Sequence, residues 1–144
     1  MPFDPNNIVV QLCAQGMEKE GMLEQNEAKN LFEQALHRAK TDFEKFIACH
    51  YIARHQDSQL EKLRWDEMAL SFALSSPDKN MHGYYSSLYL NIAKGFEDLG
   101  DFEKALINYQ LADSYAGFLS EDGYGAMIRA GIQGGMERIA YMIQ

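Results

Sequence analysis

Hydrophobic and polar positions repeat along this chain with the period of α-helices. Apolar residues recur every three or four positions over most of the sequence, and strand-like alternation is confined to the short run NIVV. Start and stop signals divide the pattern into seven predicted helices. They cover about residues 7–20, 24–40, 41–55, 58–74, 84–98 and 102–116, and a last stretch of about 122–143. We therefore expect an all-α protein.

The predicted helix ends carry recognisable capping residues. Thr41 with Glu44, and Ser58 with Glu61, have the spacing of a capping box. Gly100, in the sequence LGD, is expected to take the left-handed conformation that ends a helix. The first helix is expected to begin after Asn6 and Asn7 and to stop near Gly21, and SSPDKNMHG is expected to form a loop before the helix 84–98.

A small–large–small pattern occurs twice and predicts paired helices. Residues 28–36 read AKNLFEQAL and residues 105–112 read ALINYQLA, each with an aromatic residue four positions after Ala and another Ala three positions later. Small residues let two helices approach closely, and the aromatic ring fills the space where they diverge. Trp65, next to Met68, Ala69 and Phe72, is expected in the core of a second helix of this kind.

Residues 86–119 resemble one unit of the tetratricopeptide repeat family. The residues at the family's characteristic positions are Tyr89, Ile92, Ala93, Phe96, Ala105, Tyr109 and Ala112. Residues of about 9–42 resemble a looser copy, about 41–85 a degenerate copy, and about 122–143 the unpaired capping helix of such arrays. The chain is thus similar to short bacterial proteins of this family. The resemblance implies one domain over residues 1–144, a right-handed α-α superhelix of about three helix hairpins plus a C-terminal capping helix.

Composition and charge argue against several classes of protein. The formal net charge is −8 over 144 residues, and no cluster of Lys and Arg is present, so a nucleic-acid partner is not expected. No apolar run approaches the roughly 20 residues of a membrane span, and no basic segment precedes the first apolar run, as a signal peptide would require. Cys13 and Cys49 are expected to be buried thiols in a reducing compartment, which favours a cytoplasmic protein.

Motifs that would support catalysis are missing from the sequence. The four histidines, His37, His50, His55 and His82, lack metal-ligand spacing, so no metal site is expected. The glycine-rich run GYGAMIRAGIQGG follows a helix and lacks the Lys of a phosphate-binding loop; its glycines are expected to allow close helix contact. No strand–loop–helix unit of a methyltransferase is present either. We therefore expect no enzyme and no cofactor.

The resemblance implies non-catalytic binding of a protein or peptide in a concave groove lined by first helices. Tyr84, Asn91 and Lys94 lie on the face of the helix 84–98 opposite its apolar side chains. The expected partner-binding residues are Tyr84, Asn91, Lys94, Arg54, His50, Tyr124 and Arg129. The alternative is a small enzyme or small-molecule sensor with a closed pocket around His50, Arg54, Asn91 and Tyr124. A third reading is a regulator that works mainly by oligomerising.

The last predicted helix offers an apolar face for self-association. An unpaired terminal helix in a short repeat array leaves apolar surface to cover. A homodimer is therefore expected to use Gly131, Ile132, Met136, Ile139 and Met142.

Overall fold

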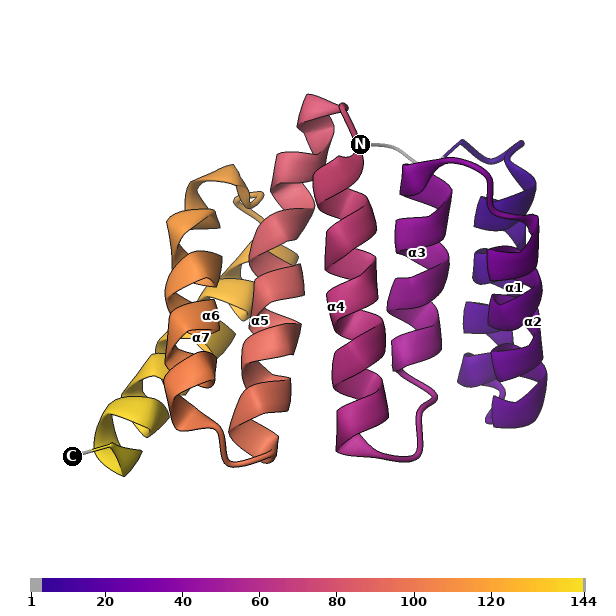
Figure 1. The fold of residues 1–144 in the computed structure, drawn as a ribbon. Helices are drawn as coiled ribbons and strands as arrows, with labels where there is room; N and C mark the ends of the chain where they lie inside the picture. Colours follow the sequence, from indigo (N-terminus) through magenta and orange to yellow (C-terminus); the bar gives the residue numbers. More distant parts are fainter. Residues whose placement is uncertain (1–3, 144) are drawn as a thin grey trace. The chain divides into compact units, whose positions relative to one another are not determined.

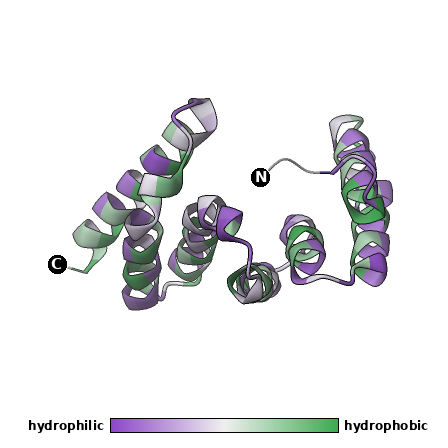
Figure 2. Ribbon diagram, turned by 90° about the horizontal axis from the view of Figure 1, so that it is seen from above, coloured by the Kyte–Doolittle hydropathy of each residue, from purple (hydrophilic) through white to green (hydrophobic). Residues whose placement is uncertain are grey.

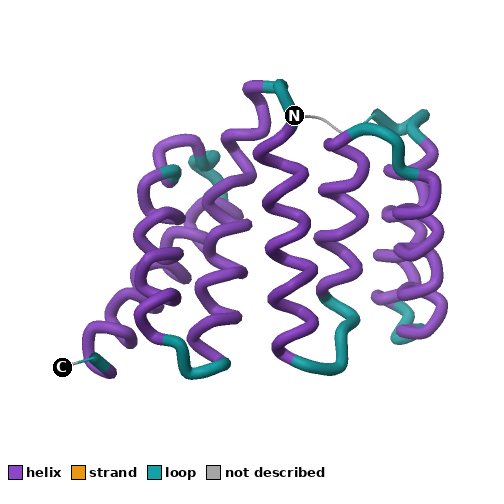
Figure 3. Tube along the Cα trace, in the orientation of Figure 1, coloured by secondary structure: helices purple, strands orange, loops and turns teal. Residues whose placement is uncertain are grey.

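The computed structural model describes residues 4–143 and, in that range, contains helices and no strand (Figure 3). This confirms the prediction of an all-α protein. The α-helices are α1 (Ile8–Gly21), α2 (Gln25–Arg38), α3 (Asp42–Ala53), α4 (Gln59–Ser75), α5 (His82–Asp98), α6 (Phe102–Ser114) and α7 (Gly123–Met142), and the 3₁₀ turns are η1 (Lys79–Met81) and η2 (Ala116–Phe118).

Local side-chain hydrogen bonds fix the helix starts that the sequence predicts. The Asn7 side chain accepts hydrogen bonds from the backbone N–H groups of Val9 and Val10, which makes Asn7 rather than Asn6 the N-cap of α1. Thr41 and Glu44 form both bonds of a capping box at the start of α3. Each bond satisfies a backbone N–H group that the first helical turn leaves without a partner.

The turns α1–α2 and α5–α6 have the same hydrogen-bond pattern. After α5, the N–H of Gly100 donates to Glu97 and the N–H of the next residue donates to Phe96, with Gly100 at φ +82°. After α1, Leu23 takes the place of that glycine at φ +62°. Both are Schellman motifs, which require a left-handed residue. The expected stop near Gly21 is confirmed, but the left-handed residue is Leu23, not a glycine.

The segment SSPDKNMHG is shorter as a loop than the sequence predicts. Only residues 76–78 lie outside a helix, because η1 follows directly and α5 already begins at His82. The Asp78 side chain accepts a hydrogen bond from the N–H of Asn80 and so starts the 3₁₀ turn. Met81, the last residue of this turn, is completely buried.

The chain divides into two compact units, Met1–Pro77 and Asp78–Gln144, and each is described by itself. The prediction of one domain over residues 1–144 stays a prediction. The first unit consists of two antiparallel hairpins, α1–α2 and α3–α4, with α3 packed on both α1 and α2 (Figure 1). A Cβ on Gly16 of α1 would overlap the Phe32 ring of α2, so the absence of a side chain lets the two helices approach. Tyr51 of α3 stacks on Phe32 with the ring centroids 5.1 Å apart.

The second unit consists of the α5–α6 hairpin and α7, which packs on both of its helices. Ala93, Ala105 and Ala112 are completely buried at the crossings. Tyr109 of α6 is also fully buried, and its ring lies where a Cβ on Gly135 of α7 would stand. Hydrophobic and hydrophilic positions are interspersed along the helices (Figure 2), and in this unit the buried apolar residues of α5, α6 and α7 form its core.

Candidate functional site

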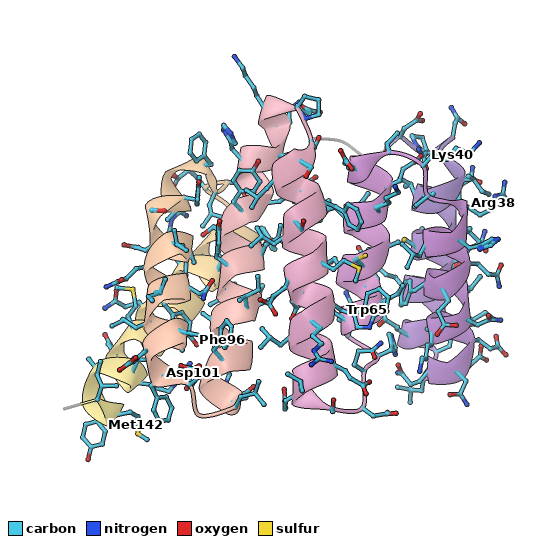
Figure 4. All side chains as sticks on the ribbon, viewed as in Figure 1. Arg38, Lys40, Trp65, Phe96, Asp101 and Met142 are labelled. Carbon is cyan, nitrogen blue, oxygen red and sulfur yellow. The ribbon has the colours of Figure 1, made fainter. Side chains whose placement is uncertain are left out.

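A cavity of about 460 Å³ opens at the end of the second unit where α5, α6 and α7 meet. It lies beside the α5–α6 turn and the last turns of α7, where Figure 4 labels Asp101 and Met142. Its walls combine apolar and charged side chains. They are Glu97, Asp98, Phe102, Glu137, Arg138, Tyr141 and Met142. We refer to it as the α7 cavity.

The apolar wall of the α7 cavity is accessible to solvent. Tyr141 is 78% exposed and Met142 is 54% exposed, although both are large hydrophobic side chains. Phe102 is half-buried and packs against the core formed by Ala93, Ala105 and Tyr109. An accessible apolar wall on a packed base is typical of a site that receives an apolar group.

A network of ion pairs and hydrogen bonds fixes the charged side of the cavity. Arg138 of α7 donates from Nε to Glu97 Oε2 at 2.8 Å and from Nη2 to Glu97 Oε1 at 3.1 Å. The Tyr109 hydroxyl donates to Glu97 Oε1 at 2.6 Å, and Arg138 Nη2 lies 3.3 Å from that hydroxyl. A bidentate pair of this kind has a defined geometry, so it holds the second half of α7 against α5.

The same network settles the protonation states of its members. The hydrogen bonds from Arg138 lower the pKa of Glu97, despite its burial. Burial and the nearby Glu97 carboxylate raise the pKa of the Tyr109 hydroxyl. The hydrogen bonds to Glu97 raise the pKa of Arg138. At neutral pH Glu97 and Arg138 stay charged and Tyr109 stays protonated, so these groups hold structure rather than exchange protons.

The rim of the α7 cavity is acidic. Three carboxylates, on Glu97, Asp98 and Glu137, stand against the single guanidinium of Arg138, which Glu97 already neutralises. Asp98 accepts from Lys94 Nζ at 2.8 Å on the exposed surface of α5. Glu137 is exposed and accepts only a neutral amide hydrogen bond, from Gln133, among the interactions described.

The predicted site residues of the second unit lie on α5 and α7. Tyr84 and Asn91 are half-buried and Lys94 is exposed, and none of the three lines the α7 cavity. Tyr124 is 48% exposed at the start of α7. Arg129 points toward its own unit: its guanidinium donates to the backbone carbonyls of Ala116, Leu119 and Ser120 at 3.3–3.4 Å. Its described contacts fasten the segment around η2 to α7.

Of the predicted site residues of the first unit, His50 lies on α3 and Arg54 is the C-cap that follows it. Arg54 pairs with Glu20 at the end of α1, and its guanidinium lies 5.0 Å from the centre of the Tyr51 ring. His55, which no prediction singled out, also binds Glu20, with Nε2 2.7 Å from Oε2. The described contacts of Arg54 therefore join α1 to α3.

His50 lies in an unusual environment for a histidine. Its Nδ1 is buried and has no hydrogen-bond partner among the described residues, and its ring contacts Phe46 and Tyr51. Burial, helped by the charges of Arg54 and Lys62, lowers the pKa of His50 to about 4. The ring is therefore neutral at physiological pH. The alternative pocket around His50, Arg54, Asn91 and Tyr124 draws on both units and stays a prediction.

The face of α7 that was expected to form a dimer is largely occupied by the second unit itself. Ile132 and Ile139 are 2% and 0% exposed in the core, and Met136 packs against the same core. Gly131 lies against Leu90 of α5. Of the five predicted residues only Met142 is largely exposed. The apolar stripe of α7 covers α5 and α6, which leaves mainly Met142 of the five accessible to a second chain, and the homodimer stays a prediction.

Trp65 is half-buried rather than a core residue, which corrects the prediction from its apolar neighbours. Trp65, which Figure 4 labels, forms one wall of a second cavity in the first unit. This cavity has a volume of about 420 Å³. The other lining residues are Lys29, Glu33, Leu36, His37, Ile52 and Gln56. Met68 is 43% exposed on the same helix. The true core positions of α4 are Leu63, Ala69 and Ala73, together with Asp66, whose pKa burial raises and which pairs with Lys62 at 2.7 Å.

Cys13 and Cys49 are buried free thiols, as predicted, and burial raises their pKa values to about 12 and about 11. Across residues 4–143, no three His, Cys, Asp or Glu side chains gather closely enough to hold a metal ion. None of the helices described there combines the length and apolar character needed to cross a membrane.

The chain matches no protein-family model, no curated protein and no solved structure. The site is therefore described by its own residues alone. The predictions from the sequence did not include four residues that line the α7 cavity: Glu97, Phe102, Arg138 and Tyr141. A sequence signal did exist: Tyr141, Met142 and Ile143 form an apolar run at the end of a helix whose apolar stripe is already complete without them.

Proposed function

We propose that this protein is a non-catalytic binding module for another protein or a peptide, and that the α7 cavity is its main contact site. The observation that carries the proposal is the accessible wall of Tyr141 and Met142 beside an open cavity of about 460 Å³. Large, exposed apolar side chains on a rigid base are typical of the centre of an interface. The partner inserts an apolar side chain between these residues and Phe102.

The state of the ionisable groups supports binding over catalysis. A general acid or base needs a pKa near the working pH and access to the substrate. Glu97, Tyr109 and Arg138 instead have pKa values shifted away from neutrality, and each bonds to the others. They serve to hold the site in shape.

We also propose a tetratricopeptide-like arrangement of the hairpins. Both units support it, since a small residue meets an aromatic ring at the helix crossing: Gly16 with Phe32 in the first unit, and Gly135 with Tyr109 in the second. In this arrangement Tyr84, Asn91 and Lys94 would line a groove and form a second contact region for the same partner.

The test first uses the whole chain as bait to capture its partner from native lysate. The affinity of that partner is then measured for the original chain and for variants. We expect Tyr141→Ala with Met142→Ala to weaken the recovered partner's affinity by about a hundredfold or more, because central interface residues each contribute roughly 2 kcal/mol or more. Met127→Ala is the matched control, since it removes an exposed apolar side chain from the first half of the same helix. Loss of affinity in the control alone would place the site elsewhere.

A further arm examines the groove. Asn91→Ala with Lys94→Ala leaves the core intact, because Asn91 is only half-buried and Lys94 is exposed. A partner that binds both regions loses affinity in both double variants. A partner that is unaffected by either, while circular dichroism shows both variants folded, contradicts the proposed function.

A further inference from the structure

We infer that the α7 cavity selects a peptide segment in which a large apolar side chain is flanked by Lys or Arg. This inference rests on the proposed function and names the chemistry of the partner. The apolar walls define the anchor, and the charges around them define its neighbours.

The anchor follows from the shape and lining of the cavity. Phe102, Tyr141 and Met142 form an apolar surface on one side, and the volume of about 460 Å³ lies within the roughly 300–1,000 Å³ range of pockets that enclose a ligand group. The methionine thioether and the aromatic rings adapt to side chains of different shape. The anchor is therefore a large aliphatic or aromatic side chain, not a polar one.

The flanking charge follows from the rim. The guanidinium of Arg138 is paired with the Glu97 carboxylate through Nε and Nη2, so its positive charge is balanced within the site. Among the described ion pairs, Asp98 is paired only with the exposed Lys94. A lysine or arginine of the partner can take the place of Lys94 in this ion pair. Glu137 carries an exposed negative charge with no cationic partner among the described interactions.

Charges beyond the cavity act in the same direction. Glu103 in the first turn of α6 adds a negative charge beside the α5–α6 turn, whereas Asp101, the N-cap of α6, is paired with Lys104 at 3.8 Å. The whole chain carries a formal charge of −8. Complementary charge at an interface increases the rate of association and selects among partners.

The same charges disfavour two other occupants. A second copy of this chain would bring another −8 to an acidic rim, and like charges brought together cost free energy. An acidic peptide meets the same repulsion. A basic segment is the occupant that the rim favours.

The experiment selects binders for the whole, folded chain from a displayed library of random short peptides. We expect the enriched peptides to carry Phe, Trp, Leu, Ile or Met with Lys or Arg within a few positions. Their affinity should fall as ionic strength rises, because exposed charges are screened by salt. Enriched peptides without a basic bias, or with an acidic bias, would overturn the inference.

A charge reversal tests the rim directly. Glu137→Lys should weaken an enriched peptide about threefold or more, since an exposed attraction becomes a repulsion. The matched control is Asp113→Lys, which makes the same change of charge on an exposed residue. Asp113 lies at the end of α6, whereas the cavity lies at the start of that helix. Equal losses in both variants would reduce the effect to overall charge and overturn the inference.

The outcome also separates this inference from the proposed function. If the enriched peptides bind through Tyr141 and Met142 but show no preference for basic residues, the proposed function stands and the inference about charge is wrong. If no peptide is enriched, or if binding is insensitive to Tyr141→Ala with Met142→Ala, both are wrong.

Discussion

At the scale of single residues, two adjacent glycines of α7 have opposite roles. Gly135 lies against the Tyr109 ring, which is fully buried and hydrogen-bonded to Glu97, so the ring has no room to move. The nearest atom to a Cβ on Gly134 is Arg138 Nη1, at 3.4 Å, the end of a flexible side chain. We expect Gly135→Ala to destabilise the protein by about 1–3 kcal/mol through overpacking. Gly134→Ala should be neutral or stabilising by up to about 1 kcal/mol through helix propensity. Urea unfolding of both variants measures the difference, and equal effects would show that α7 is rotated from the orientation described.

A second residue-scale prediction concerns Glu97 and pH. Its pKa is lower in the folded chain than its ordinary value of 4.5, mainly because of Arg138, so its ionised form stabilises the fold above that value. The contribution disappears as pH falls below 4.5 and Glu97 is protonated. We expect Glu97→Gln to cost about 1.5–3 kcal/mol at neutral pH, the range for hydrogen bonds to charged groups. Unfolding measured along a pH series should show this gap closing in acid. Glu103→Gln, an exposed carboxylate of α6, should show no such trend.

At the scale of elements, the crossing of α5 and α6 depends on small side chains. Ala105 is completely buried and packs with Ala93 and Tyr109. We expect Ala105→Leu to lower stability by about 1–3 kcal/mol, because a larger side chain forces the helices apart. Ala126→Leu is the matched control, since Ala126 is exposed on α7. Thermal unfolding followed by circular dichroism should give a lower Tm for the first variant and a nearly unchanged Tm for the second.

The elements are also what the sequence predicts best. Helix periods and caps are local, so residues such as Asn7, Thr41 and Gly100 show where helices begin and end. What covers a helix is not local. The apolar stripe with Ile132 and Ile139 was visible in the sequence, but the pattern is the same whether a second chain or the protein's own α5 and α6 covers it. The α7 cavity could not be predicted for the same reason, because it depends on the meeting of Glu97 and Arg138, which are 41 positions apart.

At the scale of the whole molecule, the division into two compact units has a measurable consequence. The chain has one tryptophan, Trp65, which lies in the first unit, so its fluorescence reports on that unit alone. Circular dichroism reports on the helices of both. We expect Gly135→Ala, in the second unit, to move the transition seen by circular dichroism more than the one seen by fluorescence. Gly16→Ala, which overlaps Phe32 in the first unit, should move the fluorescence transition. If both probes shift together in both variants, the chain unfolds as one cooperative whole.

The turn after α1 contains a residue whose backbone conformation destabilises the folded chain. Leu23 is 84% exposed and adopts a left-handed conformation, at φ +62°, whereas the equivalent position after α5 is Gly100. For an L-residue with a side chain this conformation costs about 1–2 kcal/mol, and glycine returns roughly 0.5–1 kcal/mol of that through the greater freedom of its unfolded chain. Leu23→Gly should therefore gain up to about 1 kcal/mol, measurable as a rise in Tm of a few degrees. The natural sequence therefore keeps a destabilising residue in this turn. Replacing it is a starting point for engineering a more heat-resistant form, because the change leaves the lining of both cavities unaltered.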